Sequence, residues 1–503
     1  MKEYRLDRGF RLTICVCAGG MLVLILALLL MCQQAFAGAY QNRALLPNWL
    51  LWPAALVVVA GLFALRGRET APAKDRPWLL RAVFLAALAV QFVVVRCCWT
   101  HLGWDPGQVH DAAERIARGL DFSIYREYFS RYPNNAAITL LFVPPLWAAV
   151  RLGLGVPYVA LPYLGAVMLN ISAYLCVRCL RLLTHSRVAN GLGTALAIGW
   201  IALSPYNLYP YTDVFTILFP ISMLTVWLRV KRSLVKWSLI SLLAFLGAAL
   251  KPTVLIGLIA LLMIQTARFF GKRLTWARAR TAALALLAMA LCAVPGRVFE
   301  AEATRFLTGS AHPQAQHSIT HFFMMGMNND TYGGNDQSDV AYSASFPTLK
   351  QRRQAEMARG MERLSSRGLA ENLRFFAVKA YKAYADGSFA SHGSFIDVEI
   401  PQRSSRVSAF LRSLYHKKGR LMPYCQTVAQ LAWLGVLTLC AYTAFTRRRE
   451  PAVAVICLTL IGLTLYLLIF EVWPRYLFLY APYFVLLSAL AIDRPLRKAR
   501  HEK

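Results

Sequence analysis

Apolar runs of about 20 residues recur along this chain, and they restrict its fold more than any other feature. A run of this length forms a helix that can cross the hydrocarbon of a bilayer. Of the 503 residues, 57% are hydrophobic and 16% are charged, whereas soluble domains carry about 25% charged residues. Backbone groups in lipid must be hydrogen-bonded within the protein, which favours helices. The sequence therefore predicts an all-α polytopic membrane protein.

Segments of this kind are predicted to span the membrane wherever charged and turn residues do not interrupt the hydropathy. They lie at residues 11–33, 47–65, 78–97, 157–177, 189–205, 214–230, 233–250, 252–269, 280–297, 426–446, 452–470 and 476–492. A thirteenth apolar run, 136–152, contains Pro144 and Pro145, which remove helix donors. The expected fold is a bundle of about 12 to 13 transmembrane helices.

The basic residues predict the orientation, because Lys and Arg accumulate in cytoplasmic loops. Lys2, Arg5 and Arg8 precede the first span, so the N-terminus is placed in the cytoplasm. Every later basic cluster falls on the same side only if residues 136–152 do not cross. We therefore predict a re-entrant or interfacial helix there, cytoplasmic termini, and a multi-pass protein of the cell membrane. The net charge of +30 fits contact with anionic lipid heads, and no nucleic-acid recognition module is visible.

These spans divide the chain into four predicted regions. Residues 1–77 form an N-terminal transmembrane hairpin, and residues 78–297 form the transmembrane core. Residues 298–425 are an α-rich extracytoplasmic insertion, with a polar helix at 349–364 and an amphipathic one at 370–385. Residues 426–503 form the C-terminal spans and a basic cytoplasmic tail.

Four charged residues lie on the outer side of the membrane in this topology. Asp105 follows the third span in Trp-Asp-Pro-Gly, and Asp213 ends the stretch Ser-Pro-Tyr-Asn-Leu-Tyr-Pro-Tyr-Thr-Asp. Lys251 precedes Pro252, and Arg475 lies in Glu-Val-Trp-Pro-Arg-Tyr. Charges so close to lipid are costly unless they pair or bind a ligand. An Asp can act as a general base or hold a divalent cation such as Mg or Mn, while Lys and Arg bind phosphate. The set suits a phosphorylated lipid substrate.

Short motifs around these residues resemble those of the GT-C superfamily of integral membrane glycosyltransferases, which includes protein O-mannosyltransferases and the aminoarabinose transferase of lipid A. They are Asp105 with Ala113 and Gly119 at fixed spacing, Tyr132-Pro133, Tyr-Thr-Asp213, Gly-x-x-x-Lys251 and Pro-Arg475-Tyr476. The tract His321-Phe-Phe-Met-Met-Gly-Met-Asn-Asn-Asp330, followed by Thr-Tyr-Gly-Gly, is similar to a Gram-positive subgroup of uncharacterised integral membrane members. Pro106 stands where many members carry a second acid, which leaves Asp105 as the only acid at that spot.

The resemblance implies a GT-C-like fold and a hexosyltransferase-type activity that uses a polyprenyl-phosphate-linked sugar. Asp105 would be the catalytic base and Asp213 a second catalytic acid. Lys251 and Arg475 would bind the donor phosphate. Further substrate contacts would come from Arg131, Tyr132 and Tyr476.

We therefore expect an inverting glycosyltransferase that transfers a sugar to a glycan, lipid or protein acceptor of the cell envelope on the extracytoplasmic face. The alternative is a transporter or flippase of lipid-linked saccharides, which should carry paired charges at mid-bilayer and internal repeats. The charges here gather on one side and no repeat is visible, which favours the enzyme.

Two weaker patterns allow alternatives. His312, His317 and His321 have a spacing that metal sites use, but histidines of a polar surface loop look the same. Tyr206, Tyr209 and Tyr211 are expected in the aromatic belt at the membrane interface rather than as a platform for a sugar.

Overall fold

The computed structural model describes residues 3–70, 76–271, 275–309, 316–391, 405–416 and 418–493, and the elements in these ranges are all helical. The all-α prediction is confirmed. Twelve helical segments are long and apolar enough to cross a membrane, and each coincides with one predicted span.

The spanning helices that run without a break are α1 (Glu3–Met31), α2 (Asn48–Gly67), α3 (Pro77–Cys98), α7 (Ala160–Leu183), α11 (Ser233–Leu250), α12 (Leu255–Phe270), α13 (Trp276–Thr308), α19 (Met422–Thr446) and α20 (Pro451–Ile469). The other three spans are interrupted. They contain α8 (Arg187–Ala197), the pair α9 (Thr212–Thr216) and α10 (Leu218–Arg229), and α21 (Ala481–Ile492). A π-helical turn at Ile198–Ala202 and 3₁₀ turns at Pro205–Leu208 and Pro474–Tyr480 complete them.

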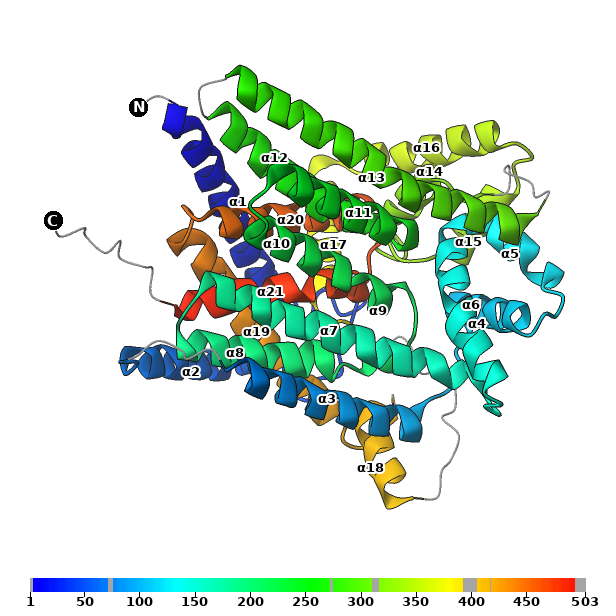
Figure 1. Cartoon of the computed structure of the whole chain (residues 1–503), viewed down its shortest axis with the longest axis horizontal. Coiled ribbons are helices and arrows are strands. Elements are labelled where there is room, and N and C mark those ends of the chain that lie inside the picture. Colours follow the sequence, from blue (N-terminus) through cyan, green and yellow to red (C-terminus); the bar gives the residue numbers. More distant parts are fainter. Residues whose placement is uncertain are drawn as a thin grey trace.

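The start of α1 and the end of α21 lie at the same end of the bundle, as the charge pattern predicts (Figure 1). Contacts between chain segments hold this end together. The Glu69 carboxylate, just past α2, accepts a hydrogen bond from Ser186 Oγ at 2.7 Å. Arg447, after α19, pairs with Asp493 at 3.1 Å, next to the end of α21. The loops that join the helices at the opposite end carry the candidate site residues.

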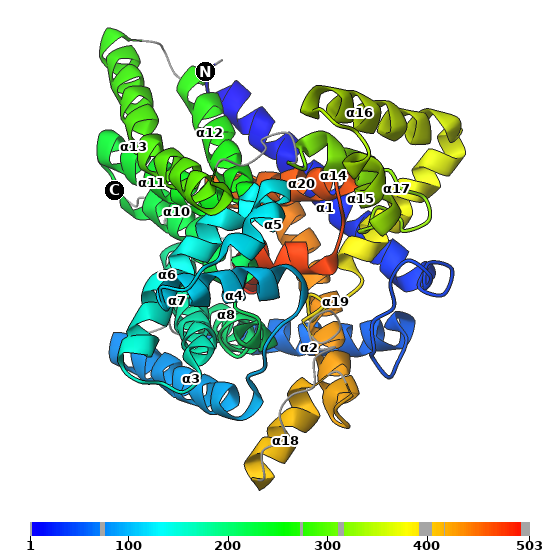
Figure 2. The ribbon, with the colours of Figure 1, turned by 90° about the vertical axis from the view of Figure 1, so that its right-hand side faces the viewer.

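Three short helices cap that opposite end: α4 (Trp104–Ala117), α5 (Arg126–Arg131) and α6 (Ala136–Arg151) (Figures 1 and 2). The 16 residues of α6 extend over about 24 Å, less than the ~30 Å of bilayer hydrocarbon. The α6 helix packs against α4 and is not one of the twelve spanning segments. Val109, Ala112 and Ala113 of α4 are buried, whereas Leu120 lies beyond the helix and is exposed.

The insertion also consists of helices. They are α14 (Ile319–Gly326), α15 (Gln337–Ala344), α16 (Leu349–Ser366), α17 (Leu369–Tyr384) and α18 (Arg406–Tyr415). The α16 and α17 helices coincide with the two helices predicted from the polar and amphipathic patterns. The α13 helix continues to Thr308, past the predicted start of the insertion. Figure 2 shows α14, α15 and α16 grouped beside the end of α20.

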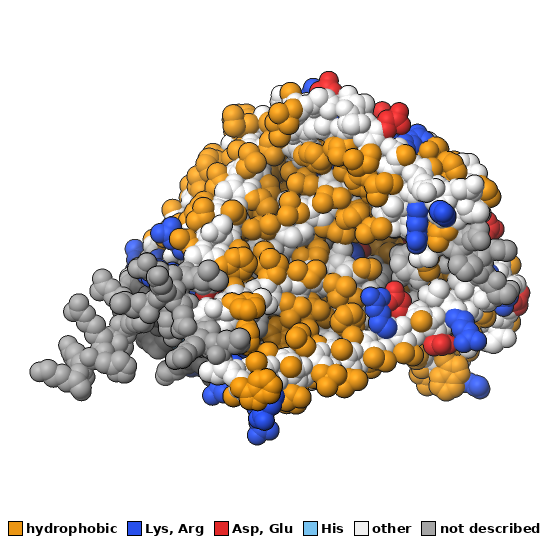
Figure 3. All heavy atoms as spheres, turned by 90° about the horizontal axis from the view of Figure 1, so that it is seen from above, with side chains coloured by type: hydrophobic (Ala, Val, Ile, Leu, Met, Phe, Trp, Pro, Cys, Tyr) orange, Lys and Arg blue, Asp and Glu red, His pale blue; other side chains and the backbone are white. Residues whose placement is uncertain are grey.

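The centre of the bundle is α21, in which every residue is buried. It packs against α7, α8 and α19. The hydroxyl of Thr443 donates a hydrogen bond to the Leu487 carbonyl at 2.8 Å, so the helix pair is joined by polar contacts as well as packing. Around this centre the outer surface is apolar: Figure 3 shows a band of hydrophobic side chains between two ends that carry the charges. Such a band is expected where lipid surrounds the protein.

The arrangement predicts which loops are accessible from outside the cell. We expect a membrane-impermeant maleimide to label Leu120→Cys in intact cells, because Leu120 is exposed at the end that carries α4. His185→Cys, exposed between α7 and α8, should react only after permeabilisation. The parent chain reports the background from the native cysteines. Labelling of His185→Cys from outside would contradict the orientation.

Candidate functional site

Two charged residues from neighbouring spans form a buried pair at the end of the bundle opposite the termini. Asp213 lies in the first turn of α9, and Lys251 lies in extended backbone between α11 and the turn Pro252–Val254. The Lys251 ammonium forms an ion pair with Asp213 Oδ1, and the two side chains are 14% and 1% exposed. Asp213 Oδ2 is buried and has no hydrogen-bond partner among the described residues. Burial lowers the pKa of Lys251, and Asp213 opposes this shift.

The turn between α20 and the last span brings a second cation to the same place. Arg475 and Tyr476 belong to the 3₁₀ turn Pro474–Tyr480. The Tyr476 ring lies near both cations: its centroid is 5.1 Å from Lys251 Nζ and 5.2 Å from Arg475 Cζ. Arg475 donates a hydrogen bond to the Tyr209 hydroxyl at 3.4 Å, and its buried Nε has no partner within the described ranges. The two predicted phosphate-binding cations therefore lie together, and each retains binding capacity.

Asp105 approaches this cluster from the first loop. It lies in the first turn of α4, half-buried, and forms a hydrogen bond with Tyr128. Burial raises the pKa of the Asp105 carboxyl, while the Tyr128 hydrogen bond and the Arg475 charge oppose the rise. Tyr128 in turn accepts from the Asn135 amide at 2.5 Å, and Asn135 accepts from Tyr211 at 2.6 Å. A carboxylate with a raised pKa is a stronger base near neutral pH.

The backbone before Asp105 is constrained. Trp104 adopts a φ of 55°, a left-handed conformation that costs a non-glycine residue energy. At Gly107 a Cβ would lie 2.6 Å from the Leu102 carbonyl oxygen, so this turn has no room for a side chain. The Trp-Asp-Pro-Gly segment thus fixes the position of the Asp105 carboxyl at the start of α4.

Glu471 is a site residue to which the sequence assigned no role. Burial raises the pKa of its carboxyl, and the charges of Arg475 and Lys382 oppose the rise, as does a hydrogen bond with Tyr476. The Lys382 ammonium lies 4.7 Å from the centroid of the Trp473 ring and donates to the Thr331 carbonyl at 2.8 Å. Neither Glu471 nor Lys382 belongs to a motif recognised in the sequence. The two residues meet because α17, which carries Lys382, packs against the turn between α20 and the last span.

The two other predicted substrate contacts, Tyr132 and Arg131, have different surroundings. Tyr132 is half-buried, and the nearby Asp105 carboxylate adds to the effect of burial in raising its pKa. The Arg131 guanidinium forms an exposed ion pair with Glu127 on its own helix, and its charge also acts on Tyr132, where it lowers the pKa. The backbone of Arg131 contacts the insertion, because its carbonyl accepts a hydrogen bond from the His317 amide at 2.9 Å.

The three tyrosines expected in the interface belt lie inside the protein, so that prediction is wrong. Tyr206, Tyr209 and Tyr211 are at most 6% exposed. Tyr206 donates to the Phe389 carbonyl at 2.6 Å and stacks on Phe478 with ring centroids 4.2 Å apart. The stretch turns inward after Pro205 and lines the interior of the site end.

The side chains around Asp105 do not resemble a site for Mg or Mn. Such ions take several oxygen ligands, whereas the groups that interact with Asp105 include the Tyr128 hydroxyl and the Arg475 cation. Among the described residues, one group of metal-ligating side chains converges, and it consists of His317, His321 and Glu356 in the insertion. His312 lies outside the described residues.

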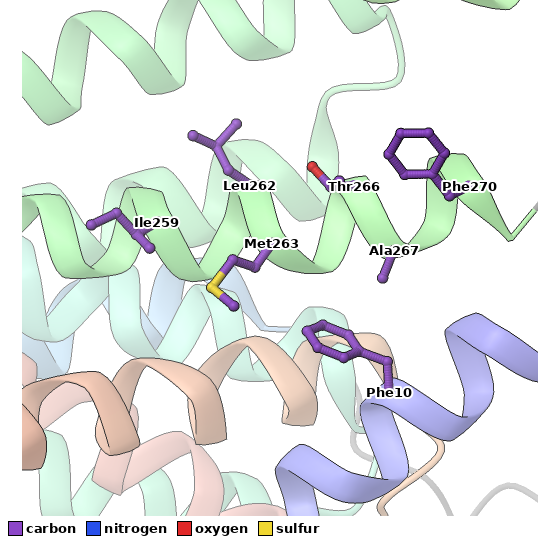
Figure 4. A pocket seen from close by; sticks show the side chains of 7 residues that line it. All are labelled: Phe10, Ile259, Leu262, Met263, Thr266, Ala267 and Phe270. Atoms are coloured by element: carbon purple, nitrogen blue, oxygen red, sulfur yellow. The ribbon is translucent and has the colours of Figure 1, made fainter.

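A separate pocket lies far from these charges. It has a volume of about 400 Å³ and lies between α1 and α12 near the end of the bundle that carries the termini. In Figure 4 the Phe10 ring of α1 faces Met263 and Ala267 of α12. The lining is apolar, so this pocket offers space for a hydrocarbon chain but no catalytic group.

Comparison with known proteins gives the family. The model of a family described as "conserved hypothetical integral membrane protein" matches residues 49–496. The chain belongs to this family. No curated protein and no solved structure gave a match. The region shared with the conserved integral membrane family begins in α2 and includes Asp105, Asp213, Lys251 and Arg475, whereas α1 precedes it.

The buried ion pair predicts a measurable effect on stability. Lys251→Met leaves the buried Asp213 carboxylate without its cation, which typically costs about 3–5 kcal/mol. The purified variant should therefore unfold at a temperature several degrees lower than the parent. Lys251→Met combined with Asp213→Asn removes both charges and should recover most of the loss. A double variant less stable than Lys251→Met would contradict the pairing.

Proposed function

We propose that this protein is an extracytoplasmic glycosyltransferase that takes a sugar from a polyprenyl-phosphate donor and transfers it to a cell-envelope acceptor. The observation that carries the proposal is the convergence of Asp105, Asp213, Lys251 and Arg475 at one end of the spanning bundle. These residues come from four separate segments of the chain, and their motifs resemble those of GT-C enzymes.

The charges suit a lipid-linked phosphate. The Lys251 and Arg475 cations lie against one tyrosine ring, and the Lys382 charge acts on the adjacent Glu471. A phosphate that accepted hydrogen bonds from Lys251 and Arg475 would satisfy the unpartnered Arg475 Nε and compete with Asp213 for Lys251. Both cations lie at the ends of spans, where a phosphate at the membrane surface and the apolar chain attached to it could be accommodated together.

The transfer would proceed by inversion at the anomeric carbon. Asp105 accepts the proton of the acceptor hydroxyl while the hydroxyl oxygen forms the new bond to the anomeric carbon. The bond from that carbon to the phosphate oxygen breaks, and its electron pair leaves with the polyprenyl phosphate. Lys251 and Arg475 stabilise the negative charge on this leaving group. Asp213 pairs with Lys251 and so orients this cation, in addition to its predicted role as a second catalytic acid.

A transport function fits the arrangement less well. A transporter would be expected to bind near mid-bilayer, whereas Asp105 lies outside the spans in the first turn of α4. Lys251 lies between two spans, and Asp213 and Arg475 lie in the first turns of theirs. This contrast supports the transferase over the flippase.

The proposal is tested with the purified protein in proteoliposomes that contain radiolabelled polyprenyl-phosphate sugars and a cell-envelope extract as acceptor. We expect transfer of label to the acceptor with release of polyprenyl phosphate. Movement of the labelled lipid between leaflets without transfer would overturn the enzyme and favour the transporter.

The role of Asp105 is tested by comparing two carboxylates of one helix. Asp105→Asn keeps the size of the side chain and removes the base, so turnover should fall about 10²–10⁴-fold while donor binding survives. Asp111→Asn, on the exposed side of α4, is the matched control and should change turnover little. Near-normal turnover of Asp105→Asn, or greater damage from Asp111→Asn, would remove Asp105 from the chemistry.

The pH dependence reports the environment of Asp105. The base must be ionised, so activity is lost as the pH falls through its raised pKa. The Tyr128 hydrogen bond lowers that pKa, so Tyr128→Phe should raise it further and move the acidic limb of kcat/KM to higher pH. Tyr125→Phe, a tyrosine of the same segment, should leave the limb in place. A limb that stays fixed or moves to lower pH in Tyr128→Phe contradicts Asp105 as the base.

A further inference from the structure

Two histidines and a glutamate meet inside the insertion, away from the charges of the candidate catalytic site. His317 precedes α14, His321 lies in its first turn, and Glu356 lies in the middle of α16. One ligating atom of each residue lies within 4.8 Å of those of the other two. Their exposed fractions are 7%, 1% and 0%. Two imidazoles and one carboxylate form a ligand set that zinc uses.

Several of the atoms that could ligate an ion have no hydrogen-bond partner among the described residues. Both ring nitrogens of His317 and Oε1 of Glu356 are buried and make no hydrogen bond to any described residue. Buried polar atoms without a partner are rare and commonly indicate an ion or a water molecule. A buried carboxylate oxygen beside an unpartnered imidazole needs a cation to offset the cost of its desolvation.

Contacts with neighbouring side chains orient the two histidines and the glutamate. Thr320 donates to Glu356 Oε2 at 2.6 Å, which leaves Oε1 directed to the histidines. His321 Nδ1 lies 2.7 Å from Ser343 Oγ and 3.7 Å from Glu356 Oε1. The rings of His317 and His321 are 4.0 Å apart, centroid to centroid. Metal sites use such outer contacts to fix their ligands.

The protein's own charges do not replace the ion. Arg352, one turn before Glu356, directs Nε to the Ser343 carbonyl at 2.7 Å and Nη2 to the Phe346 carbonyl at 3.2 Å. No ion pair joins Arg352 to Glu356 in the described part of the chain.

We propose that His317, His321 and Glu356 bind one zinc ion that joins α14 to α16. His317 also contacts the first loop. Its backbone amide donates a hydrogen bond to the Arg131 carbonyl, and its imidazole centroid lies 5.0 Å from that of the Tyr132 ring. The ion therefore fixes the insertion next to the loop that carries Tyr132. The fourth coordination position is open to water or to a further ligand.

The test uses the full-length protein in lipid nanodiscs, stripped with a chelator and reloaded with zinc. Elemental analysis should find about one zinc per chain, and Co²⁺ in place of zinc should give the ligand-field absorption of four-coordinate nitrogen and oxygen ligands. His317→Ala and Glu356→Gln should each weaken zinc binding at least tenfold. His101→Ala, exposed near the same end, and Glu362→Gln, exposed on α16, are the matched controls and should bind zinc normally.

Thr320→Val tests the outer contact without removing a ligand, and its zinc affinity should fall about 10–100-fold. Zinc content well below one per chain after reloading the parent protein, or unchanged zinc binding by His317→Ala, would overturn the proposal. If the ligand variants fail to fold, the cobalt titration of the parent decides, because the absence of a ligand-field band with one equivalent of Co²⁺ also overturns it.

Discussion

A backbone group that leaves a helix within the depth of a bilayer must find a partner inside the protein, and this requirement shapes the site end of the bundle. The spans that carry Asp213 and Arg475 and the segment after Lys251 are all interrupted next to those residues. The hydroxyl of Tyr480 accepts from the Gly257 amide at 2.9 Å and donates to the Thr253 carbonyl at 2.9 Å. These interruptions are stable because other parts of the chain form hydrogen bonds with the backbone groups that the helices leave unpaired. The charged side chains next to the interruptions lie in one interior region.

The sequence was sufficient for the spans but only partly for the site. Hydropathy depends on residues that are adjacent in the chain, so all twelve spans could be placed, and the parity of the basic clusters identified the short α6. Asp105, Asp213, Lys251 and Arg475 could be selected because a charge beside an apolar run is conspicuous in any fold. Their clustering was then a consequence of the topology.

The features that the sequence did not predict depend on contacts between residues that are far apart in the chain. Tyr206, Tyr209 and Tyr211 look like interface residues in sequence, but the turn after Pro205 directs them inward against Phe389 and Phe478. Tyr128 and Glu471 belong to no motif recognised in the sequence. Their interactions with Asp105 and Arg475 depend on how α5 and the turn before the last span pack in the folded protein. The predicted substrate contact of Arg131 stays a prediction, and in the structure its guanidinium pairs with Glu127, one helical turn away.

The insertion is coupled to the membrane bundle by backbone contacts rather than by side-chain packing alone. The Val472 amide donates to the Gly333 carbonyl at 2.8 Å, and the buried Lys379 ammonium donates to the carbonyls of Gly326 and Phe470 at 2.6 and 2.8 Å. A Cβ at Gly326 would lie 2.4 Å from the Ile469 carbonyl oxygen, so only glycine permits this approach.

These contacts hold both sides of the turn that leads to Arg475. Burial lowers the pKa of Lys379, and Glu471 is the acid that opposes the shift, so the same carboxylate interacts with cations from the insertion and from the last span. A change in the packing of α14 or α17 would move the Glu471–Arg475 turn and alter the charges around Lys251. The geometry of the candidate site is therefore a joint property of the spans, which position Asp213 and Lys251, and of the insertion, which positions Arg475.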